Sequence, residues 1–256
     1  MNLEINNHLF IVGGATSGFG KAIAEALLKE DAKIIAVARG EEKLKSMYGS
    51  NANAEIVAGD ITAPELIETL KQKIAQRPLH GIVVNAGGPP AKMVLETTLS
   101  DWDDAYQKIL RWKVAITQAF VPKMMKAGYG RMLYIESSSV KQPIENLVLS
   151  NSLRLAVVGM VKTLSQEIAR SGVTLNLMGP GSHNTPAIDR LYNKKSEQTG
   201  LSFEEVKKNA IHQIPVGALG EAADFAGLAL WLLSPQSRYV TGQTLMVDGG
   251  TIKGTL

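Results

Sequence analysis

Residues 8–20 read HLFIVGGATSGFG. The apolar run His8–Val12 predicts a short buried strand, and apolar residues at helical spacing resume directly after the glycines. Gly14, Gly18 and Gly20 allow a tight turn that brings the backbone close to a phosphate without a Cβ clash. The helix that follows would direct free N–H groups and its positive dipole end at that phosphate. This pattern predicts a nucleotide-binding loop, with a purely structural turn as the alternative.

The rest of the chain repeats the alternation of strand and helix. Further strands are expected at Lys33–Ala38, Glu55–Ala58, Gly81–Asn85, Arg131–Glu136, Val173–Met178 and Thr244–Val247. Further helices are expected from about Glu41 and at Pro64–Ala75, Ser100–Ala127 with Ser100 as its N-cap, Ser150–Arg170 and Glu221–Leu233. The prediction is an α/β, Rossmann-type doubly wound parallel sheet of about seven strands in three layers. It forms a single domain over residues 1–256, with a substrate lid at about 184–213.

Composition excludes several classes of protein and of site. The 256 residues include no cysteine, which excludes disulfides, thiolate metal ligands and a cysteine nucleophile, and fits a reducing cytoplasm. The four histidines lack metal-ligand spacing, so no metal site is predicted. No apolar run is long enough to span a membrane, and a net charge of +3 without a basic stripe does not indicate nucleic acid. We expect a cytoplasmic protein that acts on a small molecule.

The end of the second strand bears on the choice of nucleotide. An acidic side chain at that position would hydrogen-bond the free 2′-hydroxyl of an adenosine ribose. The chain has Arg39 there instead. Because a guanidinium suits a 2′-phosphate, the sequence predicts NADP (NADPH) rather than NAD. The alternative for Arg39 is an ordinary solvated surface arginine.

Five motifs stand in the same order as the predicted strands: the glycine turn, Asp60, Asn85-Ala86-Gly87, Pro180-Gly181 with Thr185, and Asp248-Gly249-Gly250. Together they resemble the short-chain dehydrogenase/reductase family over essentially the whole chain, and most of all the branch of 3-oxoacyl-carrier-protein reductases. The resemblance implies that Asp60 and Ile61 flank the adenine and that Asn85 to Gly87 line the cofactor ribose. It also places residues 180–185 beside the nicotinamide. The candidate cofactor-binding residues are Gly14, Thr16, Ser17, Gly18, Phe19, Gly20, Arg39, Asp60, Ile61, Asn85, Ala86, Gly87, Arg154, Pro180, Gly181, His183 and Thr185.

The chain departs from this family at the catalytic positions, which normally hold Asn, Ser, Tyr and Lys. Ser137 matches the family serine. The tyrosine position falls on Ser150, the lysine position on Arg154, and the asparagine position on Ile109. Ser150 and Arg154 stand one helical turn apart on one face of the predicted helix. An alternative for Ser150 is simply a residue at the start of a helix.

These replacements change the chemistry that the site supports. A serine has no accessible pKa for protonating an alkoxide, and an arginine does not release a proton at neutral pH. Ser137, Ser150 and Arg154 retain hydrogen-bond donors for a developing oxyanion. Such a site suits hydride addition to a conjugated alkene, where the charge is delocalised, as in some family members with altered tyrosines. Carbonyl reduction stays open if His183 supplies the proton. The alternative for His183 is a partly exposed loop histidine of which only the backbone matters.

Two classes of function follow. The first is an NADP-dependent reductase with an atypical site, acting on a carbonyl or a conjugated alkene, with Ser137, Ser150, Arg154 and His183 as catalytic candidates. The second is a catalytically inactive nucleotide-binding protein, a sensor or a structural subunit. Because the two long helices carry few charges, we also expect a homo-oligomer, and the family resemblance implies a tetramer. The sequence does not identify the substrate.

Overall fold

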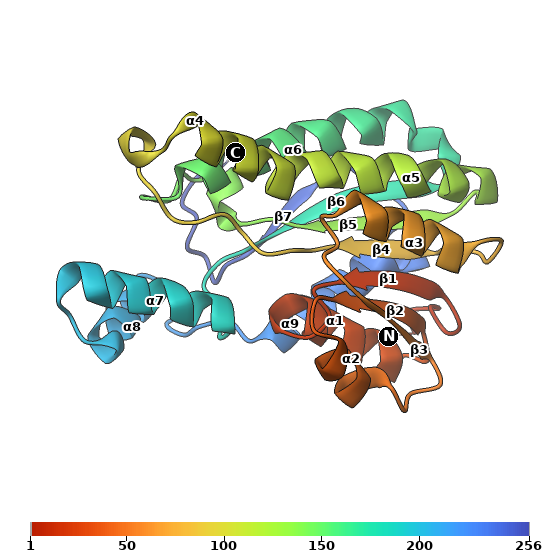
Figure 1. The fold of residues 1–256 in the computed structure, drawn as a ribbon, viewed down its shortest axis with the longest axis horizontal. Helices are drawn as coiled ribbons and strands as arrows, with labels where there is room; N and C mark the ends of the chain where they lie inside the picture. Colours follow the sequence, from red (N-terminus) through yellow and green to blue (C-terminus); the bar gives the residue numbers. More distant parts are fainter. Residues whose placement is uncertain (1, 256) are drawn as a thin grey trace.

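A parallel β-sheet runs through the computed structural model, which describes residues 2–255 (Figure 1). Within these residues the sheet has seven strands in the order β3-β2-β1-β4-β5-β6-β7. The strands are β1 (Leu9–Gly13), β2 (Lys33–Ala38), β3 (Ala54–Ala58), β4 (Gly81–Val84), β5 (Gly130–Ile135), β6 (Val173–Pro180) and β7 (Thr244–Val247). The predicted Rossmann-type α/β fold is confirmed. Met1 and Leu256, the ends of the predicted domain 1–256, lie outside the described residues.

Helices cover both faces of the sheet. One face carries α3 (Pro64–Ile74), α4 (Leu99–Ala105), α5 (Trp112–Ala127) and α6 (Val148–Glu167), which lie together in the upper part of Figure 1. The other face carries α1 (Gly18–Lys29), α2 (Glu41–Tyr48) and α9 (Ala222–Leu233). The remaining helices are α7 (Pro186–Thr199) and α8 (Phe203–His212), which project beyond the sheet within the segment predicted as a lid. Among the helices of residues 2–255, none has the length and apolar composition that a membrane crossing requires.

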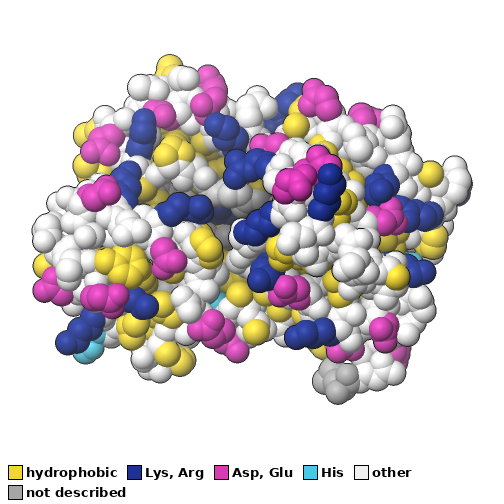
Figure 2. Space-filling view, turned by 60° about the horizontal axis from the view of Figure 1, so that its bottom comes forward, with side chains coloured by type: hydrophobic (Ala, Val, Ile, Leu, Met, Phe, Trp, Pro, Cys, Tyr) yellow, Lys and Arg dark blue, Asp and Glu magenta, His cyan; other side chains and the backbone are white. Residues whose placement is uncertain are grey.

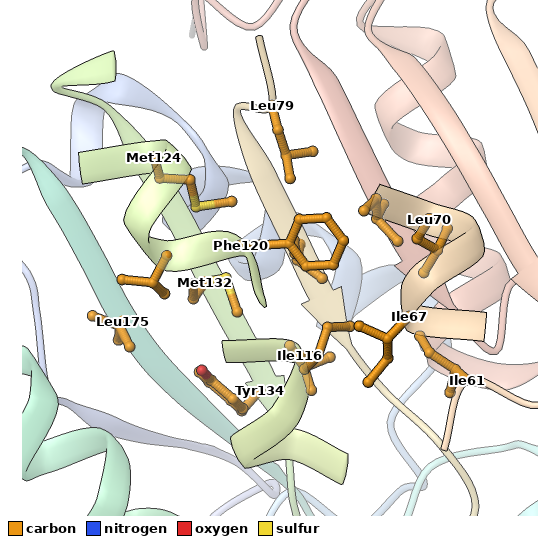
Figure 3. Packing of buried hydrophobic residues seen from close by; sticks show 14 of the residues in the cluster. Ile61, Ile67, Leu70, Leu79, Ile116, Phe120, Met124, Met132, Tyr134 and Leu175 are labelled. Carbon is orange, nitrogen blue, oxygen red and sulfur yellow. The ribbon is translucent and has the colours of Figure 1, made fainter. Parts of the chain in front are cut away.

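Each face of the sheet has its own hydrophobic core. Below α3 and α5, Phe120 packs among Ile67, Leu70, Leu79 and Ile116 (Figure 3). The opposite core packs side chains of α1, α2 and α9 against β1 and β2. Burying one large apolar side chain contributes about 1.5–3 kcal/mol. These two cores therefore hold the carboxyl ends of the strands in fixed positions relative to one another.

The chain order creates a crevice at one edge of this sheet. β1 pairs with β2 on one side and with β4 on the other, in register Phe10 to Gly81. The connections from β1 leave toward one face and those from β4 toward the other. In open parallel sheets ligands bind outside the carboxyl ends of the strands at such a switch point. All five motifs noted in the sequence follow the carboxyl ends of strands, so they gather at this edge.

The long helix predicted at Ser100–Ala127 differs from the observed one in two respects. Its N-cap is Thr98 rather than Ser100, because Thr98 Oγ1 accepts from the N–H of Asp101 while Asp101 Oδ2 accepts from the N–H of Thr98 at 2.8 Å. This capping box satisfies two helix-end donors, which Ser100 cannot do from its place inside α4. The helix is also interrupted by a π-helical turn, η2 (Tyr106–Arg111). The helix predicted at Ser150–Arg170 begins two residues earlier, at Val148, and ends at Glu167.

Candidate active site

The glycine loop after β1 adopts a conformation that only glycine accommodates well. Gly14 has φ +65° and Gly18 has φ +52°, both in the left-handed region. A Cβ atom on Gly20 would lie 2.4 Å from the carbonyl oxygen of Gly14. The N–H of Ala15 donates to Val37 O at 3.1 Å, which ties the loop to the end of β2. The loop is therefore fixed against the sheet edge, close to the residue that follows β2.

The N-terminus of α1 is open to an anion. Ser17 is the N-cap residue, yet it makes no side-chain capping bond, and the first turn holds no acidic residue. The backbone N–H groups at this end, next to Thr16 and Ser17, are thus free to bind a ligand. An uncapped helix N-terminus beside a glycine turn is suited to a pyrophosphate. Phe19 does not face this space, because its ring packs against Phe225 at 4.2 Å between centroids.

Three predicted cofactor residues follow β2 and β3. Arg39 is exposed directly after β2 and makes no hydrogen bond or ion pair within residues 2–255. Asp60 Oδ1 accepts from the N–H and the hydroxyl of Thr62, at 3.0 and 2.8 Å. Ile61 is buried, and its Cδ1 would lie 2.8 Å from a Cβ atom on Gly13. The Ile61 side chain therefore packs below the loop, and only its backbone is left for contact with an adenine.

The segment after β4 forms the wall of the crevice. Asn85 Nδ2 donates to Gly13 O at 3.1 Å, so the asparagine joins the ends of β1 and β4. Ala86 is half-buried, whereas Gly87 and Gly88 are exposed. These glycines leave the backbone of this wall accessible to a flat ligand such as a ribose or a nicotinamide.

The segment after β6 closes the opposite wall. The N–H of Gly181, which follows Pro180, donates to Val247 O at 2.9 Å. Thr185 is buried, with its Cγ2 directed at Gly18. Both contacts set this segment across the crevice from the glycine loop.

His183 lies behind the crevice. It is only 3% exposed. Its ring stands edge-on to Phe19 and Phe225, at 5.0 and 5.8 Å between centroids, and Nδ1 lies 3.1 Å from Gly181 O. Within the described chain the ring makes no hydrogen bond to Ser137, Ser150 or Arg154. The predicted alternative, a partly exposed loop histidine, is wrong about exposure, because packing against Phe19 and Phe225 buries the ring.

The catalytic candidates lie between β5 and α6. Ser137 follows β5, and its Oγ accepts from the N–H of Ser139 at 3.1 Å. Ser150 is buried in the first turn of α6, and its Oγ accepts from Arg154 Nε at 3.0 Å. Each hydroxyl oxygen thus already accepts one bond from the protein. The hydroxyl hydrogens have no acceptor within residues 2–255 and are available to a substrate oxygen.

Sequence reasoning missed two charged residues of this region. Glu136, between β5 and Ser137, has a fully buried carboxylate. Its Oε2 accepts from Arg154 Nη1 at 2.9 Å, and its Oε1 forms an ion pair with Lys113 Nζ of α5. Arg154 Nη1 also lies 3.4 Å from Ile135 O. The three charges form a buried triad, Lys113–Glu136–Arg154, directly behind the two serines.

Burial has a measurable electrostatic consequence in this triad. It lowers the pKa of Lys113 to about 8, against the opposing attraction of the Glu136 carboxylate. The nearby Arg154 guanidinium lowers the pKa of Lys113 further. Near neutral pH the triad therefore carries two positive charges and one negative charge.

The π-helical turn sets the direction of Lys113. Ile109, predicted to occupy the asparagine position of the family, is buried within η2, and Trp112 Nε1 donates to Lys108 O at 2.9 Å. A π-turn advances the helix face and is frequent at functional sites. After it, Lys113 lies in the buried stripe of α5 with Ile116. A lysine in an apolar helical stripe, together with a glutamate at the end of a buried strand, was the signal in the sequence.

One face of the molecule is hollowed and carries basic side chains around the hollow (Figure 2). The hollow lies near the middle of this face, with Lys and Arg side chains gathered on its rim. Lys194 Nζ of α7 donates to Ala91 O at 2.9 Å, which joins the projecting helix to the segment after β4. A basic rim favours the approach of anionic ligands.

The chain is similar to known proteins over nearly its whole length. A family model described as Enoyl-(Acyl carrier protein) reductase matches residues 14–251. The 3-oxoacyl-[acyl-carrier-protein] reductase FabG of Vibrio cholerae is 30% identical over 257 residues, which cover 98% of each chain. The corresponding enzyme of Haemophilus influenzae is 31% identical over 94% of this chain and 96% of its own. The crystal structure of a single-residue variant of actinorhodin polyketide ketoreductase with NADPH superposes with a TM-score of 0.90 at 29% identity, covering 97% of this chain and 98% of that one.

Proposed function

The chain belongs to the short-chain dehydrogenase/reductase family, and on that premise we propose that it is an NADPH-dependent reductase of carbonyl-conjugated alkenes. The family membership supports an oxidoreductase. The observation that carries the finer proposal is the arrangement of Ser137, Ser150 and Arg154, which offers hydrogen-bond donors but no ionisable acid with a suitable pKa.

NADPH is the proposed cofactor. The uncapped end of α1 and the glycine loop would hold its pyrophosphate. The free Arg39 guanidinium would pair with the 2′-phosphate, and the segments after β4 and β6 would enclose the nicotinamide ribose and ring. The NADPH in the actinorhodin ketoreductase structure, which shares this fold, supports the assignment. When bound, NADPH supplies a hydride to the substrate.

The residues of the site act on the substrate oxygen. Addition of hydride to the β-carbon of a conjugated carbonyl places negative charge on the carbonyl oxygen as an enolate. Ser137 and Ser150 donate their free hydroxyl hydrogens to that oxygen, and Arg154 stabilises the charge. The α-carbon then takes its proton from solvent, so the protein needs no acid of its own. Preorganised donors of this kind typically contribute about 10²–10³-fold each.

A matched set of variants tests the proposal. Ser137→Ala and Ser150→Ala are each expected to lower turnover of an enone by about 10²-fold while NADPH affinity, measured by fluorescence titration, stays within about twofold. Arg154→Ala is expected to lower both turnover and NADPH affinity, because the family lysine at this position contacts the cofactor ribose. A wild-type protein that binds NADPH and oxidises it with no enone or ketone would instead support the inactive nucleotide-binding alternative.

Restoring the family residues distinguishes the two reductions. In the double variant Ser150→Tyr with Arg154→Lys, a phenol and an ammonium return to the family positions. If the native substrate is a conjugated alkene, enone reduction should fall because the phenol fills substrate space. A rise in ketone reduction together with unchanged enone reduction would favour carbonyl reduction as the native activity.

We also propose a homo-oligomer, with α4, α5 and α6 as the contact region. Several apolar side chains on these helices are solvent-exposed in the single chain, among them Leu99, Met125 and Leu155. Apolar surface of this kind is typical of symmetric helix-on-helix contacts. Light scattering at micromolar concentration should give the mass of a tetramer, and a monomer would contradict the proposal.

A further inference from the structure

The buried triad Lys113–Glu136–Arg154 has a role that the family resemblance does not assign. We propose that Lys113 is a positioning residue: through Glu136 it fixes Arg154 so that Nη2 faces the substrate, and its charge leaves the site with one net positive charge that binds a negatively charged substrate oxygen. This inference rests on the proposed function for the identity of that oxygen, the enolate oxygen of a conjugated carbonyl substrate.

Glu136 holds the two cations in place. Its carboxylate has no exposed surface, and the side chains of Lys113 and Arg154 are only 4% and 9% exposed. Its Oε1 pairs with Lys113 and its Oε2 pairs with Arg154, so each cation has one carboxylate oxygen to itself. Lys113 belongs to α5, Glu136 directly follows β5, Arg154 belongs to α6, and all three are buried. The geometry of the triad is therefore fixed by tertiary packing.

Arg154 is left with one direction in which to bind a ligand. Its Nε donates to Ser150 Oγ, and its Nη1 donates to Glu136 Oε2 and Ile135 O. Its Nη2 makes no hydrogen bond within residues 2–255 and would lie 3.2 Å from a Cβ atom on Gly88. A planar guanidinium has donors in a rigid fork. Fixing two of its nitrogens therefore fixes the direction of the third, which lies beside the exposed Gly88 on the crevice wall.

Lys113 determines the charge behind this nitrogen. Without it, Glu136 and Arg154 would form a neutral pair. With it, the triad carries two cations and one anion, and a buried unpaired charge is unfavourable until an opposite charge joins it. A substrate oxygen that becomes negative during the reaction supplies that charge. The stabilisation then grows with the developing charge, which favours the transition state over the neutral substrate.

The surroundings of Lys113 support a charged amine that titrates near neutral pH. Glu136, directly after β5, and Arg154 of α6 both face it. Tyr134 of β5 is joined to α5 by Thr117, whose Oγ1 lies 2.7 Å from the phenolic oxygen, and burial keeps the pKa of Tyr134 well above its usual range. Burial lowers the pKa of Lys113 to about 8, so its ammonium group loses its proton as pH rises through that value.

Three variants isolate the lysine. Lys113→Arg keeps the positive charge at all accessible pH values, and Lys113→Met removes it while keeping most of the volume. Lys126→Met is the matched control, since Lys126 is exposed on the same helix. The first readout is independent of turnover: acetate is titrated into the protein saturated with NADP⁺, and its binding is followed by calorimetry.

We expect acetate to bind wild-type protein and Lys126→Met equally at pH 7, and to bind Lys113→Met at least tenfold more weakly. Wild-type affinity should fall as pH rises through about 8, and Lys113→Arg should lose this decline. The pH profile for turnover of an enone should show the same alkaline limb in wild type and its loss in Lys113→Arg. KM for NADPH should be unchanged in Lys113→Arg and Lys126→Met, which keep the charge that fixes Arg154. A structural role alone would not move a pH limb.

The outcomes separate this inference from the proposed function. Equal acetate affinity in wild type and Lys113→Met, or an alkaline limb that persists in Lys113→Arg, overturns the role of Lys113 even if the protein reduces enones. Absence of acetate binding to wild type also overturns it. If the protein turns over no substrate but binds acetate as expected, the proposed reductase is refuted and the anion site is still supported.

Discussion

The two halves of the sheet's carboxyl edge form the site with different chemical groups, one mainly with backbone and the other with side chains. Between β1 and β4, the site consists of backbone: a glycine loop in left-handed conformations, an uncapped helix end and one asparagine bridge. Between β5 and α6, it consists of side chains, with two serines backed by three buried charges. A site made of backbone groups can bind the same ligand in many relatives, because substitutions leave the backbone groups in place. A site made of side chains changes its chemistry with a few substitutions. Under the proposed function, this difference allows a chain to keep its cofactor site while its catalytic residues diverge.

The largest expected effect is on stability, in the half made of side chains. Glu136→Gln leaves Lys113 and Arg154 buried without a counter-charge, so the free energy of unfolding should fall by about 3–5 kcal/mol. Urea unfolding at pH 7 measures it. In the control Glu55→Gln the lost partners, Lys73 and Arg77, are partly exposed, so the loss should stay below about 1 kcal/mol. Equal losses in the two variants would contradict the claim that the triad differs from surface pairs.

The next effect concerns the half made of backbone. Gly20→Ala places a Cβ atom 2.4 Å from Gly14 O, and backbone must shift to relieve the clash. A displaced loop should weaken NADPH binding by about 10²-fold, the equivalent of about 3 kcal/mol. Gly227→Ala is the control, because no atom lies within 4 Å of a Cβ atom there. Fluorescence titration that finds the same NADPH affinity in both variants would rule out a role for the loop.

A third effect concerns the pH dependence of stability. It arises at the amino edge of the sheet, away from the site, so it distinguishes titration that affects global stability from titration within the site. Burial lowers the pKa of His80 to about 4, and its ring stacks on His8 at 4.0 Å between centroids. Since the folded pKa is below the unfolded value of about 6.5, this contribution is complete above pH 6.5 and is lost as pH falls toward 4. For this half-buried group we expect a loss on the order of 2 kcal/mol.

His80→Asn tests this contribution. The asparagine retains an acceptor for the N–H of Leu9, which bonds to His80 Nδ1 at 2.9 Å, but it does not titrate. Urea midpoints at pH 7 and pH 4.5 should therefore differ less in the variant than in wild type. An unchanged difference would assign the acid sensitivity to other groups.

The smallest effect concerns the choice of nucleotide. Arg39→Asp should weaken NADPH binding about tenfold and improve NADH binding, because a carboxylate repels a 2′-phosphate and accepts from free ribose hydroxyls. Arg170→Asp makes the same change of charge at an exposed arginine of the amino edge. Parallel titrations should show a change in preference only for Arg39→Asp; equal affinity of wild type for both cofactors would remove the basis of the prediction.

The fold was largely predictable because its signals are local. Strand Lys33–Ala38 and strand Thr244–Val247 agree with the observed bounds, since apolar runs of this length between turn residues leave little ambiguity. Errors occur where two residues compete for one end. Thr98 and Ser100 both qualify as N-caps, and only the reciprocal bond with Asp101 decides between them.

The site was predictable only where it depends on local sequence. The glycine loop lies within a few consecutive residues, so its geometry follows from the chain itself. The triad joins residues 113, 136 and 154 from three elements, and their contact depends on a π-helical turn that periodicity does not reveal. His183 illustrates the reverse case: its position in the sequence indicated a place beside the nicotinamide, whereas packing turned its ring toward Phe19 and Phe225.

Transfer of deuterium from NADPH labelled at C4 tests the central claim most directly. The labelled cofactor is mixed with a cyclic enone and, separately, with the saturated ketone of the same carbon skeleton, and the products are analysed by NMR. The account predicts consumption of cofactor with the enone and deuterium at the β-carbon of a saturated ketone product. Deuterium at the carbinol carbon, from either substrate, would contradict it.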